Sequence, residues 1–488
     1  MPRKPLCALG AIALALAGSA AAPPNPFTYS PAVEAALDRI SADGLRGNLS
    51  FLASDLLEGR DTPSRGLDVA AEYIAAQFRK AGLEPAGDDG YFQTGRYVRA
   101  IPVPESFELN FRNGDETATI RQAAVEAAGP VALDGVPVIA ASLEADAPLP
   151  GAAEVAGKVI VARWQRGNAA ARGRLRQLRA LKPALVLTTG SGGGPRRALV
   201  DVDERAALAP WAAVSSDALE RASAVSVRFT PRPETPVTLR NVVGVLRGSD
   251  PALRDTCVLL TAHYDHIGAK PGCTAGDCIF NGANDNASGT ASVIEIAAAL
   301  AGLERRPRRS IVFIAFFGEE RGLLGSTHYA RRPVFPLEKT AANINLEQLG
   351  RTDSGEGPQI ANATFTGFEY SDVPAAFQAA GELTGVTVYQ SAPGNRYFSQ
   401  SDNIVFANAG VPAHTVSIAY TFPDYHGLAD HPGKIDYDNM ARVNRMLALG
   451  AVMVAENPVP PRWNEGQPQA APYVRAWKER HGAAGPAR

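Results

Sequence analysis

The adjacent carboxylates Glu319 and Glu320 are the residues of this sequence whose placement most suggests chemistry. They follow the apolar run from Ile311 to Phe317, which predicts a strand covered on both faces and which Gly318 ends. In open α/β sheets, ligands bind at the carboxyl ends of the strands. Two neighbouring carboxylates at such an edge repel each other unless a cation or a shared proton lies between them. Alone the pair is typical of a solvated loop, so the site depends on further ligands elsewhere in the chain.

Metal-ligand residue types follow other predicted strands. Six of the seven histidines lie between His263 and His431. His263 directly follows the apolar run from Cys257 to Ala262, and Asp265, two residues later, is placed to orient its imidazole. Asp285 lies in a tight turn that leads into a predicted helix, where backbone donors can tune its carboxylate.

Three further candidates complete the set. Glu347 follows the predicted strand from Asn343 to Leu346, and Tyr425 and His426 lie in a Phe-Pro-Asp-Tyr-His-Gly segment. Two neutral imidazoles and three carboxylates form a ligand set that suits zinc. An extra glutamate beside a ligand supplies the base that metal-assisted hydrolysis needs to deprotonate water.

Hydrophobic patterning predicts two kinds of structure around these residues. An amphipathic helix from Asp68 to Ala81 and a strongly alternating α/β pattern after Asn241 indicate an α/β domain. The region between contains short strand candidates and no histidine, which indicates an inserted β-rich module that shapes substrate access and carries no chemistry. We therefore divide the chain into a catalytic domain at 25–106 and 237–457, an inserted domain at 107–236 and a Pro/Ala-rich tail at 458–488, expected to drape over the surface or to be disordered.

Composition and the N-terminus bear on location. The chain has 488 residues, enough for two or three domains, and its net charge of −2 gives no electrostatic footprint for nucleic acid or an anionic membrane. Arg3 and Lys4 precede an apolar stretch from Leu6 to Ala17 and then small residues, which is typical of a secretory signal peptide, here residues 1–21. We expect an exported protein, periplasmic or extracellular, with no membrane segment in its mature form.

Three cysteines remain after removal of that peptide. Cys257 lies in an apolar strand and is expected to be a small buried hydrophobe. Cys273 and Cys278 flank a four-residue loop. A zinc pair is conceivable, but two thiols without further ligands make a poor site. An oxidising compartment favours a local disulfide.

The order His, Gly-Ala-x-Asp-x-Ala-Ser-Gly, Glu-Glu, carboxylate, Tyr-His resembles the M28 family of dinuclear zinc exopeptidases, from about Tyr29 to Ala455. The stretch Leu57-Glu-Gly-Arg also resembles the N-terminal segment of that family, and the inserted module, with Gly157 to Val161, resembles a protease-associated (PA) domain. The resemblance implies an α/β/α sandwich with a mixed central sheet (the zinc exopeptidase fold) and an inserted PA-like domain.

The same resemblance implies roles for the candidates. Two zinc ions per chain are implied, one held by His263 and Glu347 and one by Glu320 and His426, with Asp285 bridging them.

The resemblance also implies that Glu319 is the general base acting on the water between the metals, and that the Tyr425 hydroxyl helps to hold the developing oxyanion. Asp430 is implied to orient His426. The family usually has Asp at the position of Glu347, and this longer side chain can still ligate. The implied activity is that of an aminopeptidase acting on peptides with a free N-terminus.

Other readings of the residues remain open. A glutaminyl-cyclase-like acyltransferase uses a related scaffold, normally with a single zinc, and a receptor-like homologue would have lost its metals. The complete ligand set disfavours both, and Gly-x-Ser-x-Gly, which a serine hydrolase would need, is absent. Of the remaining candidates, His266 is expected at most to support a ligand, His328 to fill surface or core, His414 to be a hydrogen-bonded core residue, and Ser401-Asp402 to form part of the pocket wall. The sequence leaves open the preferred N-terminal residue, carboxypeptidase or dipeptidase specificity, and the oligomeric state.

Overall fold

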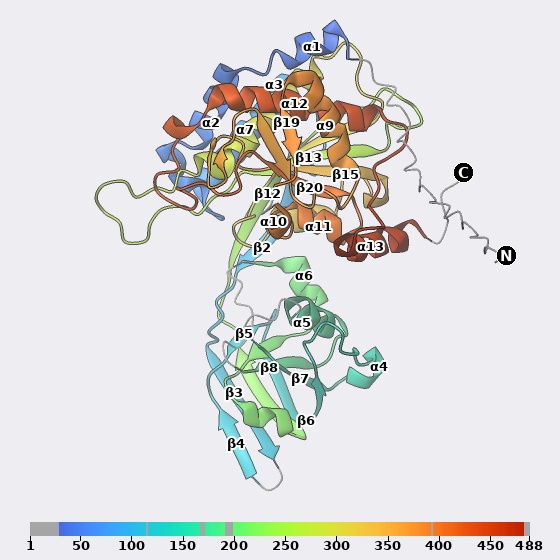
Figure 1. The fold of residues 1–488 in the computed structure, drawn as a ribbon. Helices are drawn as coiled ribbons and strands as arrows, with labels where there is room; N and C mark the ends of the chain where they lie inside the picture. The colour runs from blue at the N-terminus through green and yellow to red at the C-terminus, as the bar shows by residue number, and fades with distance from the viewer. Residues whose placement is uncertain (1–28, 114–115, 166–170, 191–198, 392–393, 483–488) are drawn as a thin grey trace, which may run out of the picture.

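A computed structural model describes residues 29–113, 116–165, 171–190, 199–391 and 394–482. Two sheets dominate it, and two long strands connect the part of the molecule built around each sheet (Figure 1). The predicted signal peptide at 1–21 lies outside the described residues. Among the helices that are described, none has the length and apolar character needed to span a bilayer.

The larger part is built on a ten-stranded sheet of order β19-β18-β20-β15-β13-β14-β12-β2-β9, with β1 pairing to β12. The neighbours β20, β15, β13 and β14 run parallel, whereas β12, β2 and β9 add antiparallel strands at one side. The sheet is therefore mixed, as predicted. Its strands are β1 (Glu84–Pro85), β2 (Phe92–Arg99), β9 (Leu199–Asp201), β12 (Thr235–Leu246), β13 (Cys257–His263), β14 (Ser310–Phe316), β15 (Thr340–Leu346), β18 (Asn362–Phe365), β19 (Thr387–Tyr389) and β20 (Ala413–Ser417).

Helices cover both faces of this sheet because its central strands are apolar on both sides. Along β13, Val258 and Leu260 pack into one hydrophobic cluster, and the intervening Leu259 packs into the other. The first cluster includes α1 (Pro31–Leu37), α2 (Ala42–Leu52), α3 (Arg65–Ala81), α7 (Ser288–Ala301), α9 (Val373–Thr384) and α12 (Tyr437–Glu456). The second includes α8 (Leu324–Arg331), α11 (Asn403–Asn408) and α13 (Ala471–His481). The predicted α/β/α sandwich is confirmed, and Figure 1 shows the two helix layers above and below the sheet.

Helix ends follow the expected capping in some places and not in others. The Ser64 side chain accepts the N–H of Leu67 at the start of α3, and Gly82 ends that helix with φ 76°. At the start of α7, Ser288 is the first helical residue, and its hydroxyl donates to the carbonyl of Asn284. The preceding turn runs directly into this helix, so no side chain caps it.

The C-terminal segment, expected to drape over the surface or to be disordered, forms a helix that packs on the domain. The Trp463 side chain is buried and donates to the carbonyl of Gly410 at 2.9 Å. Helix α13 then packs on the second cluster through Tyr473, Val474 and Trp477. The aromatic side chains of Trp463, Tyr473 and Trp477 thus fix a segment whose composition is rich in Pro and Ala.

The second sheet has the order β4-β3-β11-β6-β7-β8-β10-β5. It curls, because Phe107 of β3 and Val125 of β5, at opposite ends of that order, belong to one hydrophobic cluster. Such a separate curled sheet is consistent with a PA-like domain. Its elements are β3 (Ser106–Asn113), β4 (Glu116–Ile120), β5 (Ala124–Glu126), β6 (Val131–Ala141), α4 (Ala152–Val155), β7 (Val159–Arg163), α5 (Ala171–Ala180), β8 (Leu185–Thr189), β10 (Trp211–Ala213) and β11 (Ala224–Thr230).

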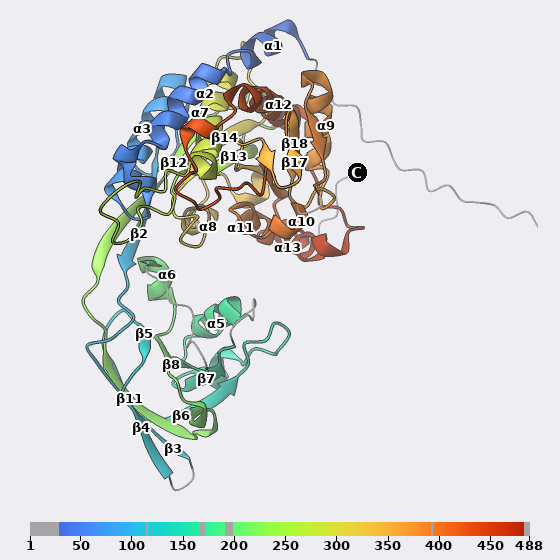
Figure 2. The same ribbon diagram turned by 60° about the vertical axis from the view of Figure 1, so that its left-hand side comes forward.

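The two parts join through more than the two connecting strands. From within the second region, β9 returns to pair with β2, and α6 (Val202–Ala207) follows it (Figure 2). Asp203 pairs with Arg96 of β2 and with Arg332, which follows α8. Glu204 pairs with Arg331 at 3.0 Å. The sequence alone gave no sign that Asp203 and Glu204 bind the part built on the ten-stranded sheet.

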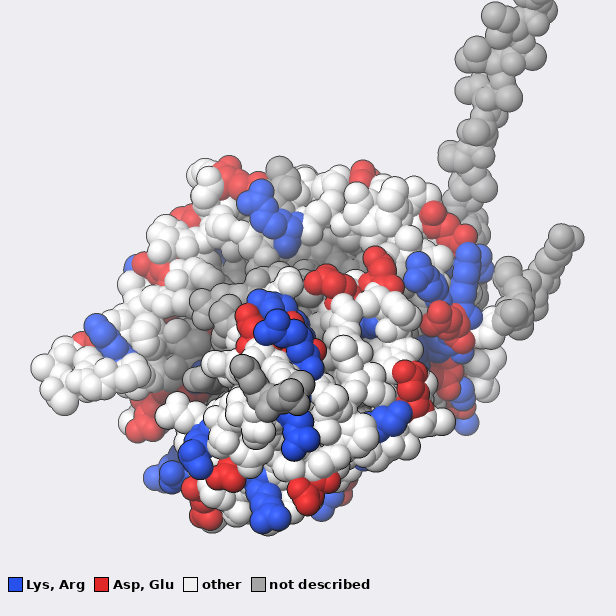
Figure 3. Space-filling view, turned by 90° about the horizontal axis from the view of Figure 1, so that it is seen from below, with Lys and Arg blue, Asp and Glu red and all other residues white. Residues whose placement is uncertain are grey.

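Charge is mixed on the surface. On the face seen from below, Lys and Arg lie interspersed with Asp and Glu (Figure 3). That distribution agrees with a net charge of −2.

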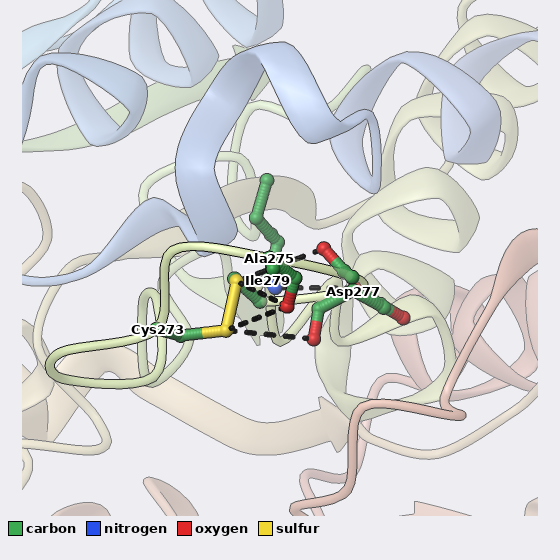
Figure 4. Close-up of a disulfide and its surroundings, with 6 residues drawn as sticks. Cys273, Ala275, Asp277 and Ile279 are labelled. Atoms are coloured by element: carbon green, nitrogen blue, oxygen red, sulfur yellow. Dashed lines mark hydrogen bonds between the residues drawn. A yellow bond between two sulfur atoms is a disulfide. The ribbon is translucent and has the colours of Figure 1, made fainter.

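Cys273 and Cys278 are bonded to each other in the loop between His266 and Asp285 (Figure 4). We expect one free thiol, that of the buried Cys257, when unreduced mature protein is unfolded and its thiols are counted. The closed loop is short, so reduction should cost about 2 kcal/mol of unfolding free energy. Reduced protein should give three thiols, and three thiols before reduction would contradict the pairing in solution.

Candidate active site

Four parallel strands end at one edge of the central sheet, and the predicted site residues follow those ends. They are His263 at the end of β13, Glu319 and Glu320 after β14, Glu347 after β15, and Tyr425 and His426 after β20. Asp285 comes from the turn Ala283–Ala287 that precedes α7. Parallel pairing brings residues far apart in the sequence to one place.

Two clusters could each hold a metal ion, and we name them the first and second metal groups. The first consists of His263, Asp285 and Glu347. His263 Nε2 lies 3.5 Å from Asp285 Oδ1 and 3.9 Å from Glu347 Oε1. His263 is fully buried, and Glu347 is partly buried.

The second metal group consists of His266, Asp285, Glu320 and His426. His426 Nε2 lies 3.1 Å from Asp285 Oδ2 and 3.3 Å from Glu320 Oε1. His266 Nδ1 lies 2.9 Å from the same Glu320 oxygen. The two oxygens of Asp285 thus face different groups, which is the arrangement of a bridging carboxylate.

The distances fit tetrahedral zinc. Two ligand atoms about 2.0–2.2 Å from one tetrahedral ion lie about 3.3–3.6 Å apart. The separations of 3.5, 3.1 and 3.3 Å that Asp285 and His426 make lie in or near that range, whereas the 3.9 Å to Glu347 is longer and the 2.9 Å between His266 and Glu320 is a hydrogen-bond distance. Moreover, His263 Nε2, His266 Nε2 and Glu347 Oε2 are buried and have no hydrogen-bond partner among the described residues. Buried polar atoms without partners are costly, and bound metal ions would satisfy such atoms.

Asp265 supports both His263 and Glu319. Its Oδ1 accepts the main-chain N–H of Glu319 at 3.1 Å and lies 3.6 Å from His263 Nδ1. Its other oxygen accepts the Thr62 hydroxyl at 3.1 Å. The carboxylate therefore faces the imidazole it was predicted to orient and also fixes the backbone of the proposed base.

Asp430 acts on a different partner from the one implied. Its carboxylate accepts the main-chain N–H groups of Asn284 and Asp285, at 2.9–3.1 Å. It therefore holds the turn that presents Asp285, and the structure gives it no bond to His426 among the described residues. Gly282 opens this turn with φ 56°, and a Cβ there would lie 2.5 Å from the His266 ring.

Arg60 ties the N-terminal segment to the site. Its fully buried guanidinium donates to the carbonyls of Leu52, Tyr264, Asn281 and Gly282. The Tyr264 carbonyl lies before the loop that separates His266 from Asp285, and the Asn281 and Gly282 carbonyls lie at the end of that loop. The sequence marked this arginine only through its resemblance to a family segment.

The electrostatics show an excess of negative charge. Burial lowers the pKa of His263, but the carboxylates facing it, with Glu319 foremost, raise it well above its usual range. Hydrogen bonds to Asp285 and Glu320 raise the pKa of His426 to about 10. Burial opposes ionisation of Glu320, yet the imidazoles of His266 and His426 hold its pKa at about 2. The carboxylates thus draw positive charge into the site, which protons or divalent cations can supply.

Glu319 and Tyr425 line a cavity beside the metal groups. Its volume is about 270 Å³, and its wall also includes Glu347, Tyr397 and Tyr420. Burial raises the pKa of Glu319 well above its usual range. A carboxyl with a raised pKa at the junction of cavity and metal groups is suited to accept and return a proton.

The remaining candidates occupy different places. His414 is buried, with Nδ1 near the Thr366 carbonyl and Nε2 near the Ser371 hydroxyl, so it is the core residue predicted. His328 is buried beside Phe317. Asp402 accepts the Ser326 hydroxyl at 2.5 Å, and burial raises its pKa to about 7.

His266 was expected at most to support a ligand. Its Nδ1 lies at hydrogen-bond distance from the Glu320 carboxylate, 2.9 Å, and the residue also lies close enough to join the second metal group. Its spacing from His263, three residues along an irregular segment, gave no periodicity from which its direction could be derived.

The mixed sheet between two helix layers is the zinc exopeptidase fold, and the groups at its edge are candidates for holding metal ions. Residues 241–451, somewhat less than half of the chain, match the model of peptidase family M28.

Relatives show how far the similarity extends. A "Probable zinc metalloprotease" of Pyrenophora teres f. teres is 38% identical over 122 residues, 25% of this chain and 25% of the relative. Aminopeptidase YwaD of Bacillus subtilis is 31% identical over 175 residues, 36% of this chain and 34% of the relative. The structure of BSAP, a zinc aminopeptidase from Bacillus subtilis, aligns over 90% of this chain and 99% of that one, with 19% identity and a TM-score of 0.47. The chain thus spans about a quarter to a third of the length of these two curated relatives.

Proposed function

We propose that this protein is an exported zinc aminopeptidase that binds two zinc ions and removes N-terminal residues from peptides. The observation that carries the proposal is the shared Asp285, whose two oxygens face the two metal groups beside the cavity that Glu319 lines. A complete second group disfavours a single-zinc glutaminyl cyclase, and the retained ligands disfavour a metal-free receptor.

Zinc bound there would act as a Lewis acid that polarises the scissile carbonyl and lowers the pKa of water. His263 and Glu347 would hold one ion and Glu320 and His426 the other, with Asp285 between them. Side chains of the protein itself would transfer the proton that the attacking water loses.

Glu319 takes the proton from the attacking water and delivers it to the leaving amine, because it lies at the cavity wall with its backbone fixed by Asp265. The Tyr425 hydroxyl donates to the oxyanion that develops on the scissile carbonyl. Burial, with nearby carboxylates, raises the pKa of Tyr425, so its hydroxyl keeps its proton. The substrate's free ammonium would pair with the carboxylates that line the cavity mouth.

The division into domains belongs to this proposal. Residues 25–106 and 237–457 would form the catalytic unit, and 107–236 would shape access to it. The return of β9 to the central sheet makes that boundary less sharp than the numbers suggest.

A test compares three matched peptides: one with a free amine, one N-acetylated and one with its C-terminus amidated. Zinc-loaded protein should cleave the first and third, releasing the N-terminal residue, and should not cleave the second. Chelation should abolish cleavage, and added zinc should restore it. Cleavage of the N-acetylated peptide at an equal rate would contradict aminopeptidase activity, and conversion of an N-terminal glutamine to pyroglutamate would favour the acyltransferase.

A further inference from the structure

The loop that carries Tyr425 and His426 is not held by burial. The His426 side chain is 36% exposed, and Tyr425 is 51% exposed. The carbonyl of Asp424 accepts the N–H of Gly427 at 2.7 Å, which closes a turn around these two residues. His426 has a φ of 53°, in the left-handed region that few non-glycine residues adopt. A conformation of that kind persists only when neighbouring contacts hold it.

Arg351 supplies such contacts. Its side chain is only 4% exposed, and its Nη1 donates to Asp424 Oδ2 at 2.9 Å. Its Nε and Nη2 donate to the two carboxylate oxygens of Asp353, and its guanidinium carbon lies 5.3 Å from the ring centroid of Phe422. Lys434 donates to the same oxygen of Asp424 at 2.7 Å. A planar guanidinium that bonds two carboxylates fixes direction as well as distance, and an ammonium does not.

The backbone of the same segment holds the other side of the site. The N–H groups of Gly350 and Arg351 donate to Asn284 Oδ1 at 2.8 and 3.1 Å, and Asn284 directly precedes Asp285. Glu347 of the first metal group lies four residues before Arg351, in the same segment 347–351. One short stretch therefore sets the Asp285 turn and the His426 loop relative to each other.

We propose that Arg351 is a positioning residue that places His426 within the second metal group. The inference rests on the proposed function, since it requires that this group holds a metal ion. Without the guanidinium the turn can move, and His426 no longer meets Asp285 and Glu320 at ligand distance. Residues that orient metal ligands typically contribute about 10–100-fold to metal affinity.

The test is a Zn²⁺ titration of the apoprotein against a chromophoric chelator, which needs no activity. Wild-type protein should show two binding steps. In both Arg351→Gln and Asp424→Asn, one step should weaken about 10–100-fold and the other should stay unchanged. The double variant should lose no more than the worse single variant, because both changes break the same contact.

Arg179→Gln is the matched control. Arg179 lies in the inserted region, its side chain is 7% exposed, and it pairs with Glu126 at 2.6 Å. Like Arg351, Arg179 is buried and pairs with a carboxylate. It packs with the second sheet, away from the metal groups on the ten-stranded sheet, so both zinc-binding steps should be unchanged. Weakening in this control equal to that in Arg351→Gln would overturn the proposal.

Asp424→Asn keeps the test decisive if Arg351→Gln does not fold, because asparagine keeps the size of the side chain and Asp424, at 17% exposed, is less buried than Arg351 at 4%. Unchanged binding in folded Asp424→Asn would overturn the role of Arg351, and so would equal weakening of both steps. The variant His426→Ala tells a wrong role for Arg351 apart from a wrong metal site. If His426→Ala binds two Zn²⁺ as wild type does, the metal site itself is wrong, and the role of Arg351 falls with it.

Discussion

Glu319→Gln should retain both zinc ions and lose turnover by about 10²–10⁴-fold, the usual effect of removing a general base. Glutamine keeps the size and polarity of the side chain but cannot accept a proton. KM should change little, because ground-state binding is intact. Metal analysis and steady-state kinetics on the same preparation check the result.

The neighbouring residue provides the control. Glu320→Gln should deplete metal, because Glu320 lies in the second metal group within 3.3 Å of His426. Excess zinc should partly rescue its activity. Loss of zinc from the Glu319 variant, with full zinc occupancy in the Glu320 variant, would reverse the two roles. Near-normal turnover in Glu319→Gln would rule out Glu319 as the general base.

Glu347→Ala should lower the zinc content from two ions per chain towards one. The side chain closes the first metal group, and its removal leaves His263 and the shared Asp285 as the described ligands there. Activity should fall with metal content. Elemental analysis after gel filtration, in buffer with a known free zinc concentration, measures the stoichiometry.

Glu347→Asp distinguishes ligand chemistry from mere packing. Aspartate is one methylene shorter but keeps the carboxylate, and it is the residue usual in the family. This variant should retain both ions. Two tightly bound zinc ions in the alanine variant would remove Glu347 from the ligand set.

Strong local signals made much of the site predictable from sequence. The apolar runs before His263 and Glu319 required buried strands, and buried parallel strands must end at one edge. That reasoning placed His263, Glu319 and Glu347 together without coordinates, and the structure shows the strands that do so. The alternating rhythm after Asn241 likewise specified helices on both faces of a sheet.

Features fixed by irregular backbone could not be predicted in this way. The family resemblance implied that Asp430 orients His426, yet its carboxylate bonds to the backbone at Asn284. The direction of His266 depends on a loop that Arg60 holds from a segment about two hundred residues earlier. Neither contact produces a periodic or compositional pattern in the sequence, because each forms between loops that are far apart along the chain.

The pairing of β2 with β12 bears on whether the catalytic unit can exist alone. Arg99 and Thr235 are direct partners across these antiparallel strands, so a two-residue type I′ turn such as Asn-Gly could join them and omit residues 100–234. The shortened enzyme would keep every residue of both metal groups. It would also lose β9 and uncover the backbone of β2 from Tyr97 to Arg99, a bare edge that invites pairing with other chains. Arg99 already places one charge on that edge, and a second, such as Val98→Lys, should help to keep a minimal version of this enzyme monodisperse.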